Sequence, residues 1–179
     1  MPPSAIWLWP LLFCTNHTVL DVTITSKLSV SEHVRTVINF CTQIMHAIRI
    51  LRSHGMDDAQ LQLVYRAVVI AKLTYASSSW WGFTAASDRQ RLEGFLRHGC
   101  RQNLCPADKP SISQLIEEAD ENLFDKIRYN PSHPLHHLLP WRTDYSYSLR
   151  SRSHNFELTH THDNWNFIDC MLFYPYNIC

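Results

Sequence analysis

Three helix-length segments follow one another between residues 28 and 101, and their apolar residues recur every three or four positions. A helix with that spacing carries an apolar stripe along one side, and the stripe has to be buried against another element. Three such segments in close succession therefore predict a small helical bundle. The stripe is longest in the first segment, where it comprises Val34, Val37, Ile38, Cys41, Ile44, Met45, Ile48 and Leu51.

Two serines are expected to cap helices at their N-termini. Ser29 is followed three residues later by Glu32, and Ser87 is followed in the same way by Gln90. In this capping-box pattern the serine hydroxyl accepts a hydrogen bond from the backbone N–H three residues on, and the Glu or Gln side chain reaches back. The pattern predicts that the first and third helices begin at these serines.

Glycine and aspartate mark the boundary between the first and second helices. Gly55 can adopt the left-handed conformation that ends a helix. Asp57 or Asp58 is expected to cap the second helix, because acidic side chains are favourable at the positive end of the helix dipole. The three serines of residues 77–79 are predicted to loosen or end the second helix, and its buried face is predicted to comprise Leu61, Val64, Tyr65 and Val68.

Shorter elements are expected on either side of these helices. Leu20, Val22 and Ile24 alternate with polar residues, which indicates a half-buried strand or hairpin. A fourth helix is predicted to begin at Ser111 and to end before Pro131. Beyond residue 141 the periodicity fades, so we expect a weakly ordered tail there.

The predicted fold class is therefore mainly α, a three- to four-helix bundle with a short N-terminal strand or hairpin and a weakly ordered C-terminal tail. Its 179 residues suffice for one domain with its own core. We expect an unmatched apolar N-terminal segment at 1–17, the strand and three helices at 18–104, the fourth helix with a Pro/His-rich turn at 105–140, and the tail at 141–179.

Charge is distributed unevenly although the net charge is zero. Residues 27–101 contain ten Lys/Arg against five Asp/Glu, whereas residues 102–179 contain six against ten. The helical half is therefore the basic half, and it is better suited to contact a polyanion.

The cysteines and the N-terminus indicate the compartment. The six cysteines show no regular framework, so we expect reduced thiols and an intracellular protein, cytoplasmic or nuclear. The apolar run at residues 6–13 lacks the positive charge that precedes a signal-peptide core, and it is too short for a membrane span. We therefore expect no membrane partner. The glycosylation sequon Asn16-His17-Thr18 would matter only in a secreted chain.

A series of short motifs gives the chain a family likeness. After the strand at residues 20–24 come Val64-Tyr65-Arg66-Ala67-Val68-Val69, Leu73-Thr74-Tyr75-Ala76-Ser77, Trp80-Trp81-Gly82 and Arg91-Leu92-Glu93. Later motifs are Leu123-Phe124-Asp125-Lys126-Ile127, Asn130-Pro131, His133-Pro134-Leu135-His136 and Leu149-Arg150-Ser151-Arg152-Ser153-His154-Asn155. Over residues 18–179 this order resembles the region just after the polymerase core in reverse transcriptases of non-LTR (LINE-type) retrotransposons. The chain departs from the family at Asp21, where glycine is usual, and in residues 1–16, which do not resemble the preceding palm.

The resemblance implies a thumb-like role, in which the chain grips the RNA/DNA template–primer duplex beside the polymerase core. The catalytic aspartates of such an enzyme, and the Mg²⁺ ions that they hold, would lie upstream, where this chain has almost no sequence. We therefore expect a catalytically incomplete fragment of an RNA-directed DNA polymerase. It would have no cofactor of its own, and the upstream polymerase core would be a candidate partner.

Asp57 and Asp58 superficially match the aspartate pair of a polymerase palm. That chemistry needs two carboxylates on a β-hairpin and a third on a neighbouring strand, which together hold two Mg²⁺ ions. Here the pair follows Gly55 and opens a helix, with no apolar strand on either side. Helix capping is the better interpretation, so no catalytic residue is predicted.

A second set of residues raises the question of zinc. The set comprises two thiols and three downstream histidines, and the gap between the thiols is one that zinc sites allow. The histidine spacing, however, fits no compact zinc finger, so we predict no metal site. We interpret the set as a helix-end thiol, a loop thiol and a His-rich surface turn. Its members are Cys100, Cys105, His133, His136 and His137.

The third helix offers the best functional surface. Arginines on its exposed face can meet successive phosphates, and two tryptophans just before the helix can stack on bases. The alternatives are a helical protein-interaction module, or a non-functional translated relic, whose basic face is merely solvated. The candidate nucleic-acid-binding residues are Arg89, Arg91, Arg97, Arg101, Trp80 and Trp81.

Overall fold

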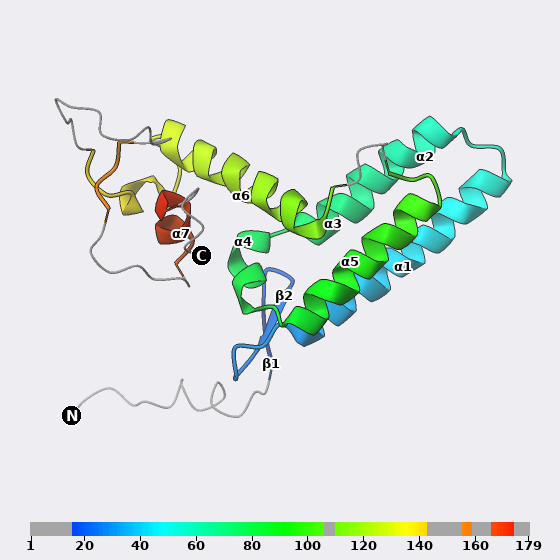
Figure 1. The fold of residues 1–179 in the computed structure, drawn as a ribbon, viewed down its shortest axis with the longest axis horizontal. Coiled ribbons are helices and arrows are strands. Elements are labelled where there is room, and N and C mark those ends of the chain that lie inside the picture. The colour runs from blue at the N-terminus through cyan, green and yellow to red at the C-terminus, as the bar shows by residue number, and fades with distance from the viewer. Residues whose placement is uncertain (1–15, 106–109, 143–154, 159–165, 174–179) are drawn as a thin grey trace, which may run out of the picture. The chain divides into compact units, whose positions relative to one another are not determined.

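The structure, a computed structural model, describes residues 16–105, 110–142, 155–158 and 166–173. The chain divides into two compact units, Met1–Ser113 and Gln114–Cys179. Helices predominate in the described residues, and one short antiparallel hairpin precedes them (Figure 1). This confirms the predicted mainly α fold with an N-terminal hairpin.

The hairpin consists of β1 (Asn16–Val19) and β2 (Val22–Thr25), joined by a two-residue turn. The turn residues Leu20 and Asp21 have φ values of 47° and 66°, and positive φ at both positions is what a type I′ turn requires. Leu20 is 80% exposed, whereas Val22 is buried. The predicted place of Leu20 on the buried side of a strand is therefore wrong, because the turn begins at this residue.

α1 (Ser31–Ser53) buries five of the eight residues of the predicted stripe, and the other three, Ile38, Ile44 and Leu51, are half-buried. The capping box predicted at Ser29 is wrong, because Val30 occupies the cap position and no side chain caps the helix. Glu32 instead pairs with Arg35, one turn further on, at 2.5 Å. The backbone N–H of Ser29, which the Glu32 carboxylate was expected to meet, donates to the Thr25 hydroxyl at 3.1 Å. The buried residues of α1 are His33, Val34, Val37, Cys41, Met45 and Ile48.

The connection after α1 agrees with the prediction. Gly55 has a φ of 87°, in the left-handed region that ends helices. Asp57 caps α2 (Asp58–Val64), and its carboxylate accepts a hydrogen bond from the backbone N–H of Ala59 at 3.2 Å. The capping role expected for this aspartate is confirmed.

The second helical stretch is longer and less regular than predicted. After α2 it continues as a π-helical segment, η3 (Tyr65–Ile70), and then as α3 (Ala71–Thr74). The chain breaks at Ala76, where φ is 51°, before the short elements α4 (Ser77–Trp80) and η4 (Trp81–Phe83). The second helical stretch thus ends at Thr74, just before the three serines expected to loosen or end it, and the serines themselves begin the short α4. The backbone at Ala76, not the serine side chains, sets the break.

The buried side of this stretch also differs from the prediction. Val64 and Val68 are only half-buried. The π-helical segment has hydrogen bonds from residue i to i+5, which widens the turn and favours steady steps of four residues. The buried residues follow that spacing: Leu61, Tyr65, Val69 and Leu73.

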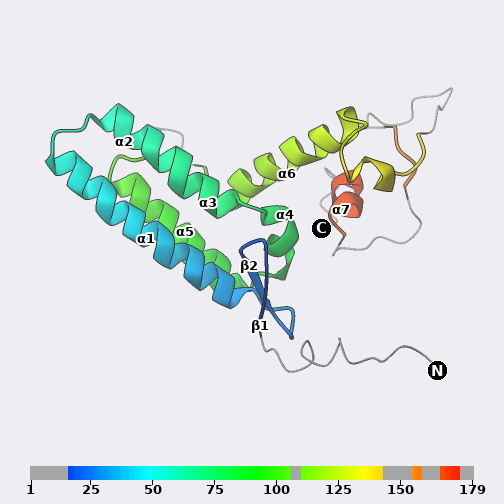
Figure 2. The same ribbon diagram turned by 180° about the vertical axis from the view of Figure 1, so that it is seen from behind.

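α5 (Ala86–Arg101) lies beside α1 and runs in the same direction (Figures 1 and 2). Near the helix starts, the Ser31 hydroxyl donates to the Asp88 carboxylate at 2.5 Å. Near the helix ends, Arg52 donates to the carbonyl of Gln102 at 2.9 Å. The capping box predicted at Ser87 is wrong, because Ala85 is the N-cap and makes no side-chain bond. Asp88, in the first turn, is buried by its bond to α1 instead.

A Schellman motif ends α5. Asn103 has a φ of 58°, its N–H bonds to the carbonyl of Cys100 at 3.1 Å, and the N–H of Leu104 bonds to the carbonyl of Gly99 at 3.3 Å. These two bonds satisfy carbonyls that would otherwise lack partners at the helix end. Leu104 is buried, which fixes the chain as it leaves the helix.

The second unit has a small apolar core. α6 (Ile112–Tyr129) has the predicted boundaries, ending before Asn130-Pro131. It is followed by η5 (His136–Leu138) and by α7 (Phe167–Phe173), which was not predicted. Much of the predicted tail, at residues 143–154, 159–165 and 174–179, lies outside the described residues. The core cluster comprises Phe124, Phe156, Ile168 and Leu172.

Candidate nucleic-acid interface

The four candidate arginines of α5 do not share one face. Arg89, Arg97 and Arg101 follow a four-residue spacing, with Glu93 between the first two, and residues so spaced lie along one side of a helix. We call these three residues the arginine row. Arg91 is two positions from both Arg89 and Glu93, and residues two apart do not face each other. The single basic face predicted from the sequence is therefore corrected to a row with Arg91 outside it.

Arg91 belongs to a structural contact between α5 and α1. Its guanidinium donates to the buried carboxylate of Asp88 at 3.2 Å, and the other oxygen of that carboxylate accepts from Ser31. Asp88 is 3% exposed, so its charge needs these partners. Arg91 thus balances a buried charge, which makes it a poor choice for binding phosphate.

Arg89 is held against Trp81 at the start of the row. Its guanidinium lies 4.7 Å from the centroid of the indole ring, and its Nε donates to the hydroxyl of Thr84 at 2.8 Å. The Thr84 hydroxyl in turn donates to the carbonyl of Trp81 at 2.6 Å. The half-buried Trp81 ring and the exposed Arg89 therefore form a preorganised planar pair, a surface on which a base or a sugar can stack.

Trp80 belongs to the core and not to the interface. Its side chain is 1% exposed, and its Nε1 donates to the carbonyl of Tyr75 at 2.9 Å. The buried His33 ring lies edge-on to it, with centroids 5.2 Å apart. A ring enclosed in this way cannot stack on a base, so the role predicted for Trp80 is corrected to packing. Because the two tryptophans are adjacent in the chain, the sequence does not indicate which of the two rings faces solvent.

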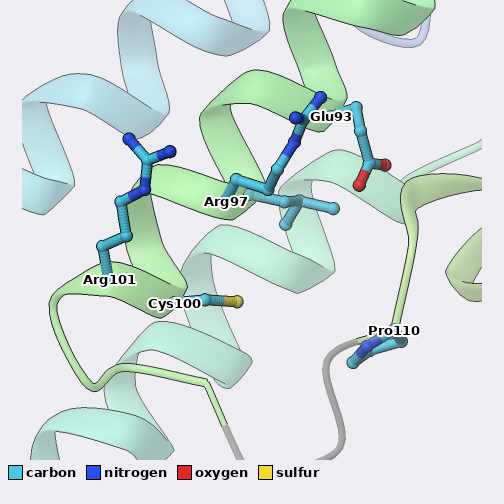
Figure 3. A pocket seen from close by; sticks show the side chains of 6 residues that line it. Glu93, Arg97, Cys100, Arg101 and Pro110 are labelled. Atoms are coloured by element: carbon cyan, nitrogen blue, oxygen red, sulfur yellow. The ribbon is translucent and has the colours of Figure 1, made fainter.

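Arg97 and Arg101 line a hollow of about 360 Å³ on one side of α5 (Figure 3). Both side chains are exposed, and neither has a hydrogen-bonding or ionic partner among the described residues. The acidic residue of the hollow, Glu93, accepts a hydrogen bond from the backbone N–H of Ile112 at 2.9 Å. The remaining lining residues are Leu96, Cys100 and Pro110.

A polar cluster at the ends of α1 and α5 was missed from the sequence. The guanidinium of Arg49 lies 3.0 Å from Nε2 of His98, and the Gln102 amide nitrogen lies 2.8 Å from the same atom. Two donors on one ring nitrogen fix it as the acceptor, so the proton of the neutral ring is on Nδ1. His98 and Gln102 are four residues apart along the chain, whereas only the parallel packing of α1 and α5 brings Arg49 to them, which no spacing within α1 indicates.

The two cysteines considered as zinc ligands are joined to each other. Cys100 and Cys105 form a disulfide, with Cα atoms 4.7 Å apart. The prediction that these thiols are reduced is therefore wrong in this structure. In the described part of the chain, no group of three or more His, Cys, Asp or Glu side chains could hold a metal ion.

The aspartate pair likewise has structural partners. Asp57 caps α2, and the carboxylate of Asp58 pairs with Arg52 at 3.0 Å. Neither residue lies on a hairpin, as the palm geometry would require.

Comparisons with protein-family models, with curated proteins and with solved structures found no match. The resemblance to LINE-type reverse transcriptases therefore stays a prediction. Over the described ranges, no helix combines the length and apolar character needed to cross a membrane.

Proposed function

We propose that the chain is a catalytically incomplete fragment of a LINE-type reverse transcriptase that binds nucleic acid through the arginine row of α5. Binding would be weak, sensitive to salt and independent of base sequence, because contacts to phosphates release counterions and carry no direct sequence information. An RNA/DNA template–primer duplex is the proposed ligand, and the upstream polymerase core a proposed partner.

One observation supports this proposal most directly. Arg97 and Arg101 lie one helical turn apart, about 6 Å along the axis, and both are exposed without a partner among the described residues. Most other cations of the bundle are engaged: Arg35 pairs with Glu32, and Arg52 with Asp58. Unpaired guanidinium groups release counterions on binding a polyanion without first breaking an ion pair.

Charge reversal of the row tests the proposal. The wild type is compared with Arg97→Glu/Arg101→Glu on a fluorescent RNA/DNA hybrid duplex, with anisotropy recorded over a series of salt concentrations. Two lost phosphate contacts should lower the magnitude of the salt slope by roughly 2 and weaken binding at least tenfold at low salt. Duplex binding that survives the double reversal would exclude the arginine row as the interface.

Arg66→Glu provides the matched control. Arg66 is exposed on η3, outside the row, so its reversal changes the net charge of the bundle without removing a row contact. We expect at most a twofold effect from this variant, since a distant charge is largely screened. Arg66→Glu changes the net charge by half as much as the double reversal, so half of its free-energy effect would indicate attraction by net charge alone.

A protein-interaction module is the second candidate, and an apolar surface favours it. Leu20, Phe40 and Tyr75 are 80%, 40% and 46% exposed. Lys72 connects them, because its Nζ bonds to Asp21 and lies 5.8 Å and 5.5 Å from the Phe40 and Tyr75 ring centroids. Exposed apolar side chains grouped in this way are typical of contact surfaces. Phe40→Ser, which leaves the arginine row unchanged, should abolish such an association and preserve duplex binding.

A further inference from the structure

The disulfide joins the last turn of the proposed binding helix to the segment that leaves it. Cys100 is on α5, one residue before Arg101, and Cys105 follows the Schellman motif. In Figure 3 the Cys100 side chain lies on the side of α5 that faces Pro110, in the hollow lined by Arg97 and Arg101. The covalent link is therefore part of the same surface as Arg97 and Arg101.

Small thiols can reach this disulfide. Both cysteines are half-buried, unlike Cys41, which is fully buried and whose pKa burial raises to about 11. A reducing compartment, where nucleic-acid enzymes work, keeps most thiols reduced, and disulfides that form there are usually transient or redox-sensing. The proposed function and the observed disulfide are compatible if Cys100 and Cys105 alternate between the disulfide and two free thiols.

We propose that Cys100 and Cys105 act as a reversible thiol–disulfide switch. The disulfide restrains the backbone at the C-terminal end of α5, and the state of the pair thereby controls the affinity of this helix for nucleic acid. In the oxidised form the crosslink holds residues 100–105 as one closed loop. In the reduced form only the two Schellman hydrogen bonds and the burial of Leu104 hold the helix end. This inference rests on the proposed function for its consequence, though not for the structural change.

The chemistry requires only a low-molecular-weight thiol such as glutathione. Its thiolate attacks one sulfur of the pair, the protein S–S bond breaks, and a mixed disulfide forms with one protein thiolate as leaving group. A second thiol then attacks the mixed disulfide. The net result is two protein thiols and one molecule of oxidised thiol, and oxidised glutathione drives the reverse reaction.

The oxidised form should bind more tightly. An ordered helix end presents Arg97 and Arg101 in place, whereas a frayed end has to be ordered when the ligand binds. Ordering one long side chain corresponds to a change in dissociation constant of about threefold. Reduction should therefore weaken duplex binding by about that factor.

The test combines hydrogen exchange with binding on the full chain. Oxidised and reduced protein, prepared with oxidised and reduced glutathione, are compared by mass-spectrometric exchange of the peptide covering residues 97–105 and by anisotropy on the hybrid duplex. We expect faster exchange in this peptide and about threefold weaker binding after reduction. Cys100→Ser/Cys105→Ser should match the reduced protein in both measurements. Its exchange and its binding should be the same in oxidised and in reduced glutathione. Cys170→Ser, which removes a thiol of the second unit that is not part of the disulfide, should behave as the wild type.

The possible failures are distinguishable. Equal exchange of residues 97–105 in the two states, or failure of oxidised glutathione to link this pair, would overturn the switch. Faster exchange after reduction without duplex binding in either state would leave the switch intact and overturn the proposed function. Binding that changes with redox state while this peptide exchanges equally would overturn the assignment to the α5 end.

Discussion

At the scale of single residues, Gly99 packs closely against the Tyr65 ring. A Cβ atom placed on Gly99 would lie 2.5 Å from the Tyr65 hydroxyl oxygen and 2.8 Å from the ring carbon that bears it. The hydroxyl is buried without a hydrogen-bond partner among the described residues, and burial raises the pKa of Tyr65 to about 12. α5 therefore approaches η3 at a distance that only glycine permits.

Gly99→Ala should lower the free energy of unfolding by about 1–3 kcal/mol, because the added methyl group forces a rigid ring to move. Gly94 lies in the same helix, and a methyl group at its Cα would have no atom within 4 Å. Gly94→Ala should therefore raise the free energy of unfolding by about 0.5–1 kcal/mol through helix propensity. Urea denaturation of both variants measures the difference, and a destabilisation of equal size in the two would contradict the close packing at Gly99.

Buried His33 should make stability depend on pH. Burial, and to a lesser extent the charge of Lys72, lowers the pKa of His33 in the folded state below its ordinary value of 6.5. As pH falls, His33 is therefore protonated at a higher pH in the unfolded chain than in the folded chain. The stability contributed by the neutral ring is therefore present above pH 6.5 and is lost below it, at a slope of at most about 1.4 kcal/mol per pH unit.

The measurement is urea denaturation of wild type and His33→Phe at about pH 7.5 and pH 5.5, on either side of an ordinary histidine pKa. The phenylalanine ring keeps the packing against Trp80 without a titrating group. The variant should lose less stability on acidification than the wild type. Identical losses would show that other histidines carry the pH dependence.

At the scale of elements, the turn of the hairpin is strained at Leu20, whose apolar side chain is exposed and contributes nothing to the core. Leu20 has a φ of 47° and is 80% exposed, and the left-handed region costs an ordinary L-residue roughly 1–2 kcal/mol. Asparagine tolerates this region better, so Leu20→Asn should stabilise the hairpin by about 1 kcal/mol. Thermal unfolding and exchange of the β1 amides measure the gain.

Val19→Asn serves as the control for that change. Val19 is exposed too, but it is a strand residue, where asparagine has a low propensity. It should be neutral or destabilising. A gain from both substitutions would attribute the effect to removal of exposed apolar surface and not to the turn.

Local backbone signals were predictable from the sequence, whereas choices made by tertiary contacts were not. Gly55 and Asp57 act through their own backbone and side chain, and both took their expected roles. Ser29 and Ser87 failed as capping boxes because Val30 and Ala85 occupy the cap positions of α1 and α5, and neither makes a side-chain bond. A capping pattern does not reveal contacts from outside the helix: the Ser29 N–H, which Glu32 was expected to meet, donates to the Thr25 hydroxyl at 3.1 Å.

The candidate interface divides in the same way. The arginine row follows from helical spacing alone, which the sequence contains. The burial of Trp80 depends on His33, 47 positions upstream in the chain, and the loss of Arg91 to Asp88 depends on the contact with α1. The burial of Trp80 and the pairing of Arg91 both depend on which helices pack together. They therefore cannot be predicted from the periodicity of one helix.

At the scale of the whole molecule, the second unit has its own apolar core, around Phe156 and α7. Phe156→Ala should remove about 3–5 kcal/mol from that core. Exchange of the α7 amides should then accelerate strongly while the α1 and α5 amides remain protected, as expected for units that open separately. Accelerated exchange throughout the chain would instead show that the two units unfold together.

The parallel packing of α1 and α5 has a consequence for synthesis of the chain. The bond between Ser31 and Asp88 spans 57 residues. The apolar residues of α1 are therefore synthesised long before α5, the helix that packs against them. At translation rates of about 5–20 residues per second, the ribosome needs roughly 3–11 s to add that stretch. During this interval the apolar side of α1 is exposed to solvent, and α2 is the first element able to shelter it. Nascent chains stalled before α5 should accordingly be the species that chaperones capture.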